Sequence, residues 1–567
     1  MAQSDAELAV GHGPWWKRLV PGLFFPALAI LNTYPLAVAP ASFIGEHGDS
    51  YFSVWRLAWI AHQLWPRPDQ LFNGNIFYPE KATLAYSDAI LLPAIVASPL
   101  HWFGVDPIVA YNIVLIAAFA LNGLAAYCLV KYLTGSMAAG LVGGSIFAFS
   151  PHRFDHFDHL EMQFAFWIPC AVLAWHKAVL SEAARGYLRV AALVAAQVLS
   201  CIYYGVFLIT WLGVLSAFRF WRTPSRAARA GALMLVPAVV VLAIYSIPYL
   251  QNRQKVGDRR TNDVRVYSAT AADFLSAPAA NRLYGWSEPL GAPERHLFPG
   301  LVAIGLFVVG VWPPVNRTVV VHIVGLLAAL ELTFGLNAHV YKFLYDWVLP
   351  FRGLRVPARA YVLVLVGFAV IAGMGLARLM TILRGAKGPR WVWRGAIPAL
   401  LIGLVSVEYF TAPRLRHVDR EIPIWYSWLK DVDDAVVFEW PVTVPWRLYD
   451  MVDLSYMARS TIHWRPMLNG YSGYYPRSYL RLLVDMRRFP DTRSLNILRQ
   501  RGATILVLHE YPHTRVRYAR AVHRLMRDPY VQPIAQDRDG SGRVAFFRLL
   551  PLPTQASSET GQPQDPR

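Results

Sequence analysis

A short polar run between two apolar segments carries the residue types best suited to chemistry. Residues 150–163 read Ser-Pro-His-Arg-Phe-Asp-His-Phe-Asp-His-Leu-Glu-Met-Gln, with three histidines, two aspartates and one glutamate. Apolar residues 137–149 precede this run and residues 164–180 follow it. A second acidic motif, Gly-Glu-His-Gly-Asp at residues 45–49, follows the first apolar segment. We expect the two motifs to face each other across one active site at a membrane surface.

Asp49 is the residue that we expect to act as a general base. A carboxylate at a membrane surface beside apolar helices can hold a proton more tightly than in water, or can bind a cation. Both properties suit the removal of a proton from a hydroxyl group. The alternative is a helix cap, because Asp49 precedes an amphipathic run at residues 50–65.

The histidine-rich run has the composition of a metal site. On a single helix, the three histidines at positions 152, 156 and 159 would lie along one face. Carboxylates and imidazoles together can bind a divalent ion such as Mg or Mn. The alternative is a solvated turn with local ion pairs. The predicted metal ligands are Asp155, His156, Asp158 and His159. The predicted substrate-binding residues of the same run are His152, Arg153, Glu161 and Gln163.

Composition indicates a polytopic membrane protein. Soluble domains carry about 25% charged residues, whereas this chain of 567 residues carries 16% and is 55% hydrophobic, with a mean hydropathy of +0.33. The net charge of +18 comes largely from Lys and Arg in short loops between apolar segments. Such loops orient helices in a membrane, so nucleic-acid binding is disfavoured. The three cysteines lie in apolar segments and imply no disulfide framework.

The apolar segments predict about eleven transmembrane helices within residues 1–411. Alternation of basic loops places the N-terminus in the cytoplasm and a long first outer loop at residues 45–106. Residues 412–553 contain no apolar segment long enough to span. They include short strand-like runs at 435–439, 504–509 and 544–549 and a helical run at 518–526, which predict an extracytoplasmic α/β domain. The polar tail 554–567 has the composition of a disordered segment.

Several arginines, Arg265 among them, lie on the predicted outer side, against the usual bias of basic residues toward the cytoplasm. Five of these arginines are predicted to bind substrate. They are Arg259, Arg260, Arg352, Arg355 and Arg359. Arginine binds phosphate through a planar fork, so these residues suit a phosphate at the bilayer surface. The alternative is pairing with lipid headgroups or with the C-terminal domain.

An aromatic and glycine-rich stretch at residues 463–476 resembles surfaces that bind sugars through ring faces and hydrogen bonds. Its predicted binding residues are Trp464, Asn469 and Tyr471. The alternative is a folded aromatic loop. The sequence contains no phosphate-binding glycine loop, dinucleotide fingerprint or metalloprotease motif.

These motifs together resemble membrane glycosyltransferases of the GT-C class, and in particular bacterial YfhO-type membrane proteins. The resembling stretches are Gly-Asp-Ser-Tyr at 48–51, Ser-Pro-His-Arg at 150–153, His-Leu-Glu-Met-Gln at 159–163, Leu-Phe-Pro-Gly at 297–300, the arginine motif at 352–359, and the residues at 463–473. The resemblance implies a polyprenyl-phosphate sugar donor and an essential acidic residue in the first outer loop. Asp49 matches that residue. Glu46 is the predicted second catalytic carboxylate, although two residues separate it from Asp49 where many GT-C enzymes have an adjacent acidic pair.

The resemblance therefore implies transfer of a sugar from a polyprenyl-phosphate donor to an extracytoplasmic envelope glycan, lipid or protein. The expected location is a bacterial inner membrane, with the lipid bilayer as partner and no nucleic acid. The alternatives are a non-enzymatic carrier or flippase for a lipid-linked glycan and a degenerate GT-C scaffold for envelope assembly.

The predicted topology is testable by labelling engineered cysteines with an impermeant reagent. Positions 222 and 387 should react only after the membrane is permeabilised, because both lie in basic loops. Position 450 should react in intact cells, and His156 is expected on the same side of the membrane. Labelling of position 450 only after permeabilisation would reverse the predicted orientation.

Overall fold

The computed structural model describes residues 16–384, 392–418, 421–442, 452–540 and 542–552. The chain forms two compact units. The helical unit comprises Met1–Phe72 and Leu84–Val418, and the α/β unit comprises Asn73–Thr83 and Asp419–Arg567. The boundary expected at residue 412 thus lies after residue 418, and a short piece of the first outer loop belongs to the second unit.

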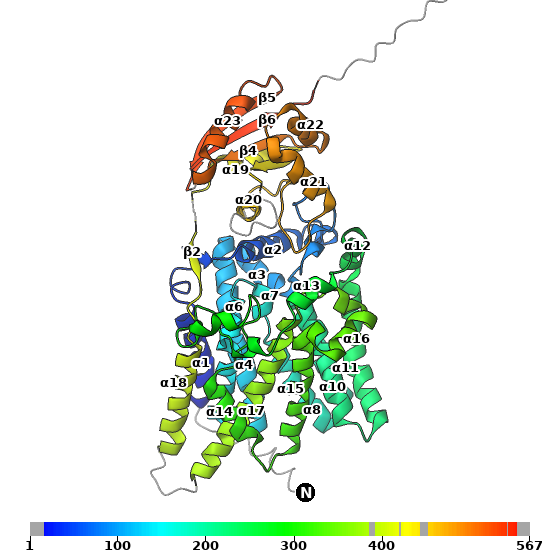
Figure 1. The fold of residues 1–567 in the computed structure, drawn as a ribbon, viewed down its shortest axis with the longest axis vertical. Coiled ribbons are helices and arrows are strands. Elements are labelled where there is room, and N and C mark those ends of the chain that lie inside the picture. The colour runs from blue at the N-terminus through cyan, green and yellow to red at the C-terminus, as the bar shows by residue number, and fades with distance from the viewer. Residues whose placement is uncertain (1–15, 385–391, 419–420, 443–451, 541, 553–567) are drawn as a thin grey trace, which may run out of the picture. The chain divides into compact units, whose positions relative to one another are not determined.

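The helical unit is a bundle of helices with one two-stranded sheet. Its longer helices run side by side, and α2 lies across them near one end of the bundle (Figure 1). The α-helices are α1 (Trp16–Asn32), α2 (Asp49–Gln63), α3 (Leu91–Trp102), α4 (Pro107–Thr134), α5 (Met137–Phe149), α6 (Pro151–Asp155), α7 (Leu160–Gln163), α8 (Trp167–Ser181), α9 (Ala184–Ser200), α10 (Ile202–Arg219), α11 (Pro224–Tyr245), α12 (Ile247–Val256), α13 (Thr261–Val266), α14 (Leu301–Val311), α15 (Arg317–Phe334), α16 (His339–Trp347), α17 (Tyr361–Arg384) and α18 (Ile397–Tyr409).

Six stretches of helix in the described part of the chain are long and apolar enough to cross a membrane. They are Pro107–Thr134, Leu160–Ser181, Ile202–Arg219, Pro224–Tyr245, Arg317–Asn337 and Pro357–Arg384. Shorter apolar helices of 10–17 residues are Leu19–Asn32, Leu91–Trp102, Leu301–Val311 and Ile397–Tyr409. These helices indicate a multi-pass membrane protein. The count of about eleven spans and the sidedness of the loops stay predictions.

Helix α17 is the central element of the bundle. It packs against α5, α14 and α15, and most of its residues are buried. A helix that is apolar on all sides is suited to such enclosure. Glycines allow the close approach, because a Cβ atom at Gly375 would collide with the carbonyl oxygen of Leu306 on α14. Small residues at such contacts are typical of helices that pack in membranes.

Two short strands hold the loop that carries the first acidic motif. Strand β1 (Phe43–Gly45) pairs antiparallel with β2 (Leu415–His417), so that Gly45 lies opposite Leu415. The backbone N–H of Glu46 continues this pairing by donating to the Arg414 carbonyl at 3.0 Å. The chain then enters α2, most of whose residues are buried.

The histidine-rich run forms two short helices, α6 and α7, rather than the single helix expected from its spacing. The break follows from side-chain competition for carbonyl groups. The Gln163 amide donates to the carbonyls of Arg153 at 3.0 Å and His156 at 2.8 Å, which satisfies acceptors that a continuing helix would use. The histidines at 152, 156 and 159 therefore do not lie on one helix face.

The α/β unit contains a four-stranded mixed sheet in the order β3-β4-β6-β5. Strands β3 and β4 are parallel, and β6 is antiparallel to both β4 and β5. The strands are β3 (Val437–Trp440), β4 (Ile505–His509), β5 (Val531–Asp539) and β6 (Gly542–Leu549). The helices are α19 (Trp425–Trp428), α20 (Val452–Ser460), α21 (Arg477–Asp485), α22 (Thr492–Gln500) and α23 (Arg515–Leu525). Its core includes Tyr426, Val437, Tyr456, Val507 and Phe546.

The segment Asn73–Thr83 is built into this α/β unit. The Met467 N–H donates to the Asn75 carbonyl at 2.7 Å, and the Tyr78 N–H donates back to the Met467 carbonyl at 2.8 Å. Ile76 and Phe77 are buried, and the Phe77 ring packs on Tyr479 with a centroid distance of 4.9 Å. The second unit is therefore completed by a piece of chain from far upstream in the sequence.

We predict that residues 419–553 produced alone are less stable than the same residues with segment 73–83 fused to them through a flexible linker. The fused segment buries two large apolar side chains and restores backbone hydrogen bonds. Phe77→Ala in the fusion should remove about 3–5 kcal/mol of unfolding free energy. Denaturant melts followed by circular dichroism measure this, and equal midpoints with and without the segment would contradict it.

Candidate active site

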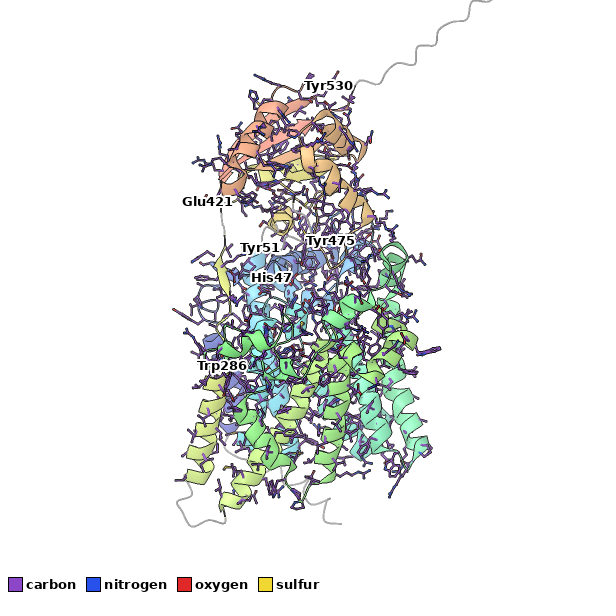
Figure 2. The ribbon with its side chains drawn as sticks, viewed as in Figure 1. His47, Tyr51, Trp286, Glu421, Tyr475 and Tyr530 are labelled. Atoms are coloured by element: carbon purple, nitrogen blue, oxygen red, sulfur yellow. The ribbon has the colours of Figure 1, made fainter. Side chains whose placement is uncertain are left out.

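Asp49 lies at the start of α2 with a largely buried carboxylate. Its side chain is 14% exposed, and it lies 3.1 Å from His47 Nδ1 and 3.6 Å from His159 Nδ1. Gly48, not Asp49, occupies the N-cap position of α2, so Asp49 is not the capping residue. Figure 2 labels His47 together with Tyr51 of α2. The two acidic motifs predicted to meet are thus in contact through Asp49 and His159.

A buried ion pair extends this contact inward. Arg56 is 1% exposed, and its Nη2 donates to Glu161 Oε2 at 3.0 Å and to Ser53 Oγ at 2.8 Å. Its Nη1 donates to the Asp88 carbonyl at 2.6 Å. Glu161 also lies 3.6 Å from His159 Nδ1, so one imidazole lies between two carboxylates.

The surrounding charges set the protonation of Asp49. Burial alone would raise the pKa of Asp49, but the charges of His159 and Arg56 and the hydrogen bond from His47 hold that pKa well below its usual range. Burial likewise disfavours charge on His159, yet the nearby Asp49 raises the pKa of the imidazole. The site therefore favours the ionised form of Asp49, contrary to the tighter proton binding expected from the sequence, because Arg56 and the two imidazoles stabilise the carboxylate charge.

The pKa of Asp158 is shifted in the opposite direction from that of Asp49. Asp158 accepts a hydrogen bond from Ser50 Oγ at 2.6 Å, and Ser50 also contacts the Tyr111 hydroxyl at 3.1 Å. Gly45 makes room for Asp158, because a Cβ atom there would overlap the carboxylate. Burial raises the pKa of Asp158 to about 6. Two neighbouring aspartates thus have pKa values displaced in opposite directions, a pattern common at functional sites.

A second charged cluster is centred on Glu294, in the loop before α14. Arg359 donates to Glu294 Oε2 through Nη2 at 2.7 Å and Nε at 3.0 Å. Arg355 lies 3.9 Å from the other carboxylate oxygen, and His156 Nε2 lies 3.9 Å from Oε2. Burial opposes ionisation of Glu294, but Arg359 and the neighbouring imidazoles lower the pKa of this carboxyl. The two arginines lie at the 3₁₀ turn η7 (Pro357–Ala360) and just before it.

Neighbouring imidazoles connect the two clusters. The ring centroids of His47 and His159 are 6.4 Å apart, and those of His159 and His156 are 6.1 Å apart. His156 contacts Glu294 in the second cluster, and His159 contacts Asp49 in the first. The Asp49 carboxylate and the Arg355–Arg359 pair therefore belong to one continuous polar site.

Three of the predicted substrate-binding residues of the histidine-rich run are enclosed and engaged by protein groups. Arg153 is 2% exposed, and it donates to the Phe147 and Met162 carbonyls at 3.3 and 2.7 Å. Gln163 donates to backbone carbonyls as described above, and His152 packs on the Tyr361 ring at 5.0 Å. Hydrogen bonds thus fix Arg153 and Gln163 in the protein interior, whereas His152 is held by ring packing.

The four predicted metal ligands have separate partners. Asp155 pairs with His296 at 2.9 Å, whereas Asp158 accepts from Ser50. His156 lies near Glu294, and His159 lies between Asp49 and Glu161. Within the described ranges, no three His, Cys, Asp or Glu side chains are placed to hold one metal ion. The four residues do not fit a shared Mg or Mn ion in this conformation, so we assign no chemical step to a metal.

The remaining predicted residues of the helical unit lie at its periphery. Glu46 is exposed, and Arg260 is exposed at the start of α13. The Arg259 N–H donates to the Arg352 carbonyl at 3.4 Å, and its own carbonyl accepts from the Tyr345 hydroxyl at 2.7 Å. Arg352 donates to the Tyr345 carbonyl at 3.3 Å. Arg259 and Arg352 thus contact α16, whereas Arg355 and Arg359 contact Glu294.

The predicted sugar-binding residues belong to the α/β unit. Asn469 is fully buried; its amide donates to the Glu439 carbonyl at 3.0 Å and to Asp453 at 2.9 Å. Asn469 therefore links its own loop to strand β3 and helix α20. Trp464, with a φ of 56°, and Tyr471 are half-buried, and their role in binding sugar stays a prediction.

Two charged residues of the site, Arg56 and Glu294, are not among those predicted from sequence. A signal for Arg56 was present, because a single arginine within the aromatic stretch 51–60 has to be paired if it is buried. The signal for Glu294 was weak. It is an isolated glutamate followed by Arg295 and His296 in a long loop, and its partners are distant in sequence.

The fold defines the class of this molecule as a polytopic membrane protein with a GT-C-like fold. It is similar to the cryo-EM structure of the arabinofuranosyltransferase AftD from Mycobacteria, with a TM-score of 0.52 and 15% sequence identity over 95% of this chain. The match covers 40% of the AftD chain, so this protein spans about two fifths of that structure's length.

The chain belongs to the family described as Domain of unknown function (DUF6311), whose model matches residues 22–343. This match includes α2, the histidine-rich run and Glu294, and ends before the arginine motif. A search of curated proteins finds no match. YfhO-type membership stays a prediction from the sequence motifs.

The pKa of Asp158 gives a testable dependence of stability on pH. Since its pKa rises from 3.8 to about 6 on folding, the folded protein binds this proton more tightly than the unfolded chain. Ionisation then lowers the unfolding free energy as pH rises from about 4 to about 6. Asp158→Asn should therefore stabilise the protein more at pH 8 than at pH 5, by a difference on the order of 1 kcal/mol.

Thermal unfolding in detergent measures this difference, and 1 kcal/mol corresponds to about 2–4 °C. Asp106→Asn is a suitable control, because the Asp106 carboxylate caps α4 by accepting from the N–H groups of Ile108 and Val109 and Asn caps equally well. An identical effect of Asp158→Asn at both pH values would contradict the assignment.

Proposed function

We propose that this protein is a membrane glycosyltransferase that moves a sugar from a polyprenyl-phosphate donor to an extracytoplasmic cell-envelope acceptor. The observation that carries this proposal is the continuous polar site in which Asp49 and the Arg355–Arg359 pair are connected through His159 and His156. Glycosyl transfer from a lipid phosphate needs a base for the acceptor and cations for the leaving phosphate. The GT-C-like fold is consistent with this chemistry.

Asp49 acts as the general base in this proposal. The acceptor oxygen attacks the anomeric carbon as the bond from that carbon to the phosphate oxygen breaks, and Asp49 takes the hydroxyl proton. A carboxylate with a lowered pKa is a weak base, so proton transfer occurs late, once the new glycosidic bond has made the hydroxyl strongly acidic. The neighbouring His159 imidazole and the Arg56 guanidinium favour the ionised form of Asp49 for this step.

Arg355 and Arg359 bind the phosphate of the donor and stabilise the charge that develops on the leaving phosphate. Arginine suits this role because its planar fork matches phosphate oxygens. Arg359 is 8% exposed on its side chain and Arg355 is 37% exposed, so one guanidinium is fixed inside while the other is open to a ligand. Tyr203 lies beside both, with its hydroxyl accepting from the Arg355 N–H at 2.8 Å and its ring 5.2 Å from the Arg359 guanidinium.

The reaction can be tested by mass spectrometry of envelope glycans and polyprenyl-phosphate sugars in a deletion strain. Loss of one sugar from the envelope, with accumulation of its lipid-linked donor, is the expected result. An unchanged glycan profile would contradict the proposal. Lipid scrambling by the purified protein without sugar transfer would instead favour a carrier for a lipid-linked glycan, and neither activity would favour an assembly scaffold.

Asp49→Asn should lower turnover by about 10²–10⁴-fold, because an amide does not accept the proton. Folding should be nearly intact, since Asn preserves size and polarity. The measurement is complementation of the glycan defect together with sugar transfer in proteoliposomes at equal protein level. Asp106→Asn, a carboxamide substitution at the cap of α4, should retain full activity. Full complementation by Asp49→Asn would exclude Asp49 as the base.

A further inference from the structure

The Glu294 carboxylate occupies the position between the two arginines that an anionic ligand would need. It receives two hydrogen bonds from Arg359, and both arginines form ion pairs with it. A carboxylate and a phosphate present similar planar or near-planar pairs of oxygens to a guanidinium fork. Glu294 therefore has the chemistry of an internal substitute for a bound phosphate.

Glu294 is held in an unusual backbone conformation. Its φ is 66°, in the left-handed region that non-glycine residues seldom adopt. It follows Pro293 in a loop, between η4 (Gly285–Leu290) and α14. Such a conformation costs on the order of 1–3 kcal/mol and persists only when surrounding contacts compensate for it. The ion pairs with the arginines supply that compensation, so their exchange for another anion would release the loop.

The two arginines differ in how firmly they hold Glu294. The contact with Arg359 is a pair of hydrogen bonds at 2.7 and 3.0 Å. The contact of Arg355 Nη2 with Glu294 is 3.9 Å, which is too long for a hydrogen bond. The Arg355 guanidinium lies over the Tyr267 ring at 5.0 Å, and its backbone is fixed by Tyr203. Arg355 is therefore pre-positioned, partly exposed and only weakly engaged by Glu294.

We propose that Glu294 is a displaceable gate on the phosphate site. When a lipid-linked phosphate binds, it replaces Glu294 beside Arg355 and takes over part of the contact that Glu294 makes with Arg359. This inference rests on the proposed function, because it takes the same arginines as the phosphate site. The gate sets a threshold of affinity that any anion has to exceed before it occupies the site. A free phosphate has to displace Glu294 with its charge alone, whereas a lipid-linked phosphate adds the burial of its apolar chain. The resident carboxylate thus lowers the apparent affinity for every anion and leaves only lipid-linked anions bound.

Phosphate binding to the full-length protein in neutral phosphatidylcholine nanodiscs tests the gate. The probes are inorganic phosphate and farnesyl phosphate, each measured as an equilibrium Kd. Glu294→Gln should lower both Kd values by about tenfold or more, because a site that is open only about a tenth of the time binds correspondingly more weakly. The selectivity of the wild type for farnesyl phosphate over inorganic phosphate should persist, because the variant leaves the lipid contact unchanged.

Two variants make the result specific. Glu288→Gln changes the same charge in the same loop, but Glu288 lies in η4 rather than beside the arginines, and its carbonyl accepts from Ser276 Oγ. It should leave both Kd values within about twofold. Arg355→Lys added to Glu294→Gln should abolish most of the gain, because Lys lacks the bidentate fork. Unchanged or weaker phosphate binding by folded Glu294→Gln would overturn the gate.

A measurement on the wild type keeps the inference testable if Glu294→Gln does not fold. Hydrogen exchange of residues 291–296 should accelerate when farnesyl phosphate binds, since Glu294 loses its arginine contacts. Unchanged or slower exchange in that segment would overturn the gate. If the protein transfers no sugar but Glu294→Gln binds phosphate more tightly, the proposed glycosyltransferase function is rejected and the gate is retained. If the protein transfers sugar but Glu294→Gln does not change phosphate binding, the glycosyltransferase function is retained and the gate is rejected.

Discussion

The position of the His159 imidazole between two carboxylates is the interaction on which the rest of the site depends. Its Nδ1 lies 3.6 Å from Asp49 and 3.6 Å from Glu161, and Glu161 in turn pairs with the fully buried Arg56. Buried charges of this kind are tolerated only as a compensated set. Removing Arg56 or Glu161, the most enclosed members, would leave the other uncompensated inside the protein. The ionised state of Asp49 is therefore a property of the whole group rather than of one residue.

The two halves of the site are held with different rigidity. Arg359 lies in the turn η7 that leads directly into α17, and Pro357–Arg384 is the most buried of the six candidate spans in the described chain. Asp49 is fixed by the pairing of β1 with β2 on one side and by buried α2 on the other. Glu294 lies on a loop and depends on its ion pairs for its conformation. Arg359 and Asp49 are thus held by regular structure, whereas Glu294 is held by ion pairs that a ligand can replace. This combination suits a site that opens to a lipid-linked ligand.

Local sequence signals predicted the parts of this structure that depend on local chemistry. The acidic residues after the first helix and in the histidine-rich run were identified because polar residues between apolar segments are conspicuous. The strand-like run 504–509 coincides with β4 (Ile505–His509), since a short apolar run with β-branched residues indicates a buried strand. The continuous helix expected at 152–161 is broken because the Gln163 amide takes up backbone carbonyls, an effect that helical spacing does not reveal.

The parts that were not predicted depend on contacts between distant residues. Glu294 has its partners at positions 156, 355 and 359, and no periodicity in its own loop indicates them. The same is true of Asn73–Thr83, which reads as ordinary loop sequence yet forms part of the α/β unit. Among the five outer arginines, the sequence did not separate Arg355 and Arg359 from Arg352, whose guanidinium contacts the backbone of α16 instead.

The inserted segment also has a consequence for the order in which the protein is made. Residues 73–83 leave the ribosome more than three hundred residues before the chain from Asp419 that surrounds them. At synthesis rates of about 5–20 residues per second, Ile76 and Phe77 have no partners for tens of seconds. During that interval their apolar side chains are available to chaperones, to lipid or to other chains. Maturation of the second unit therefore waits for synthesis of the chain beyond Asp419, and a product that ends before that residue would leave Ile76 and Phe77 exposed.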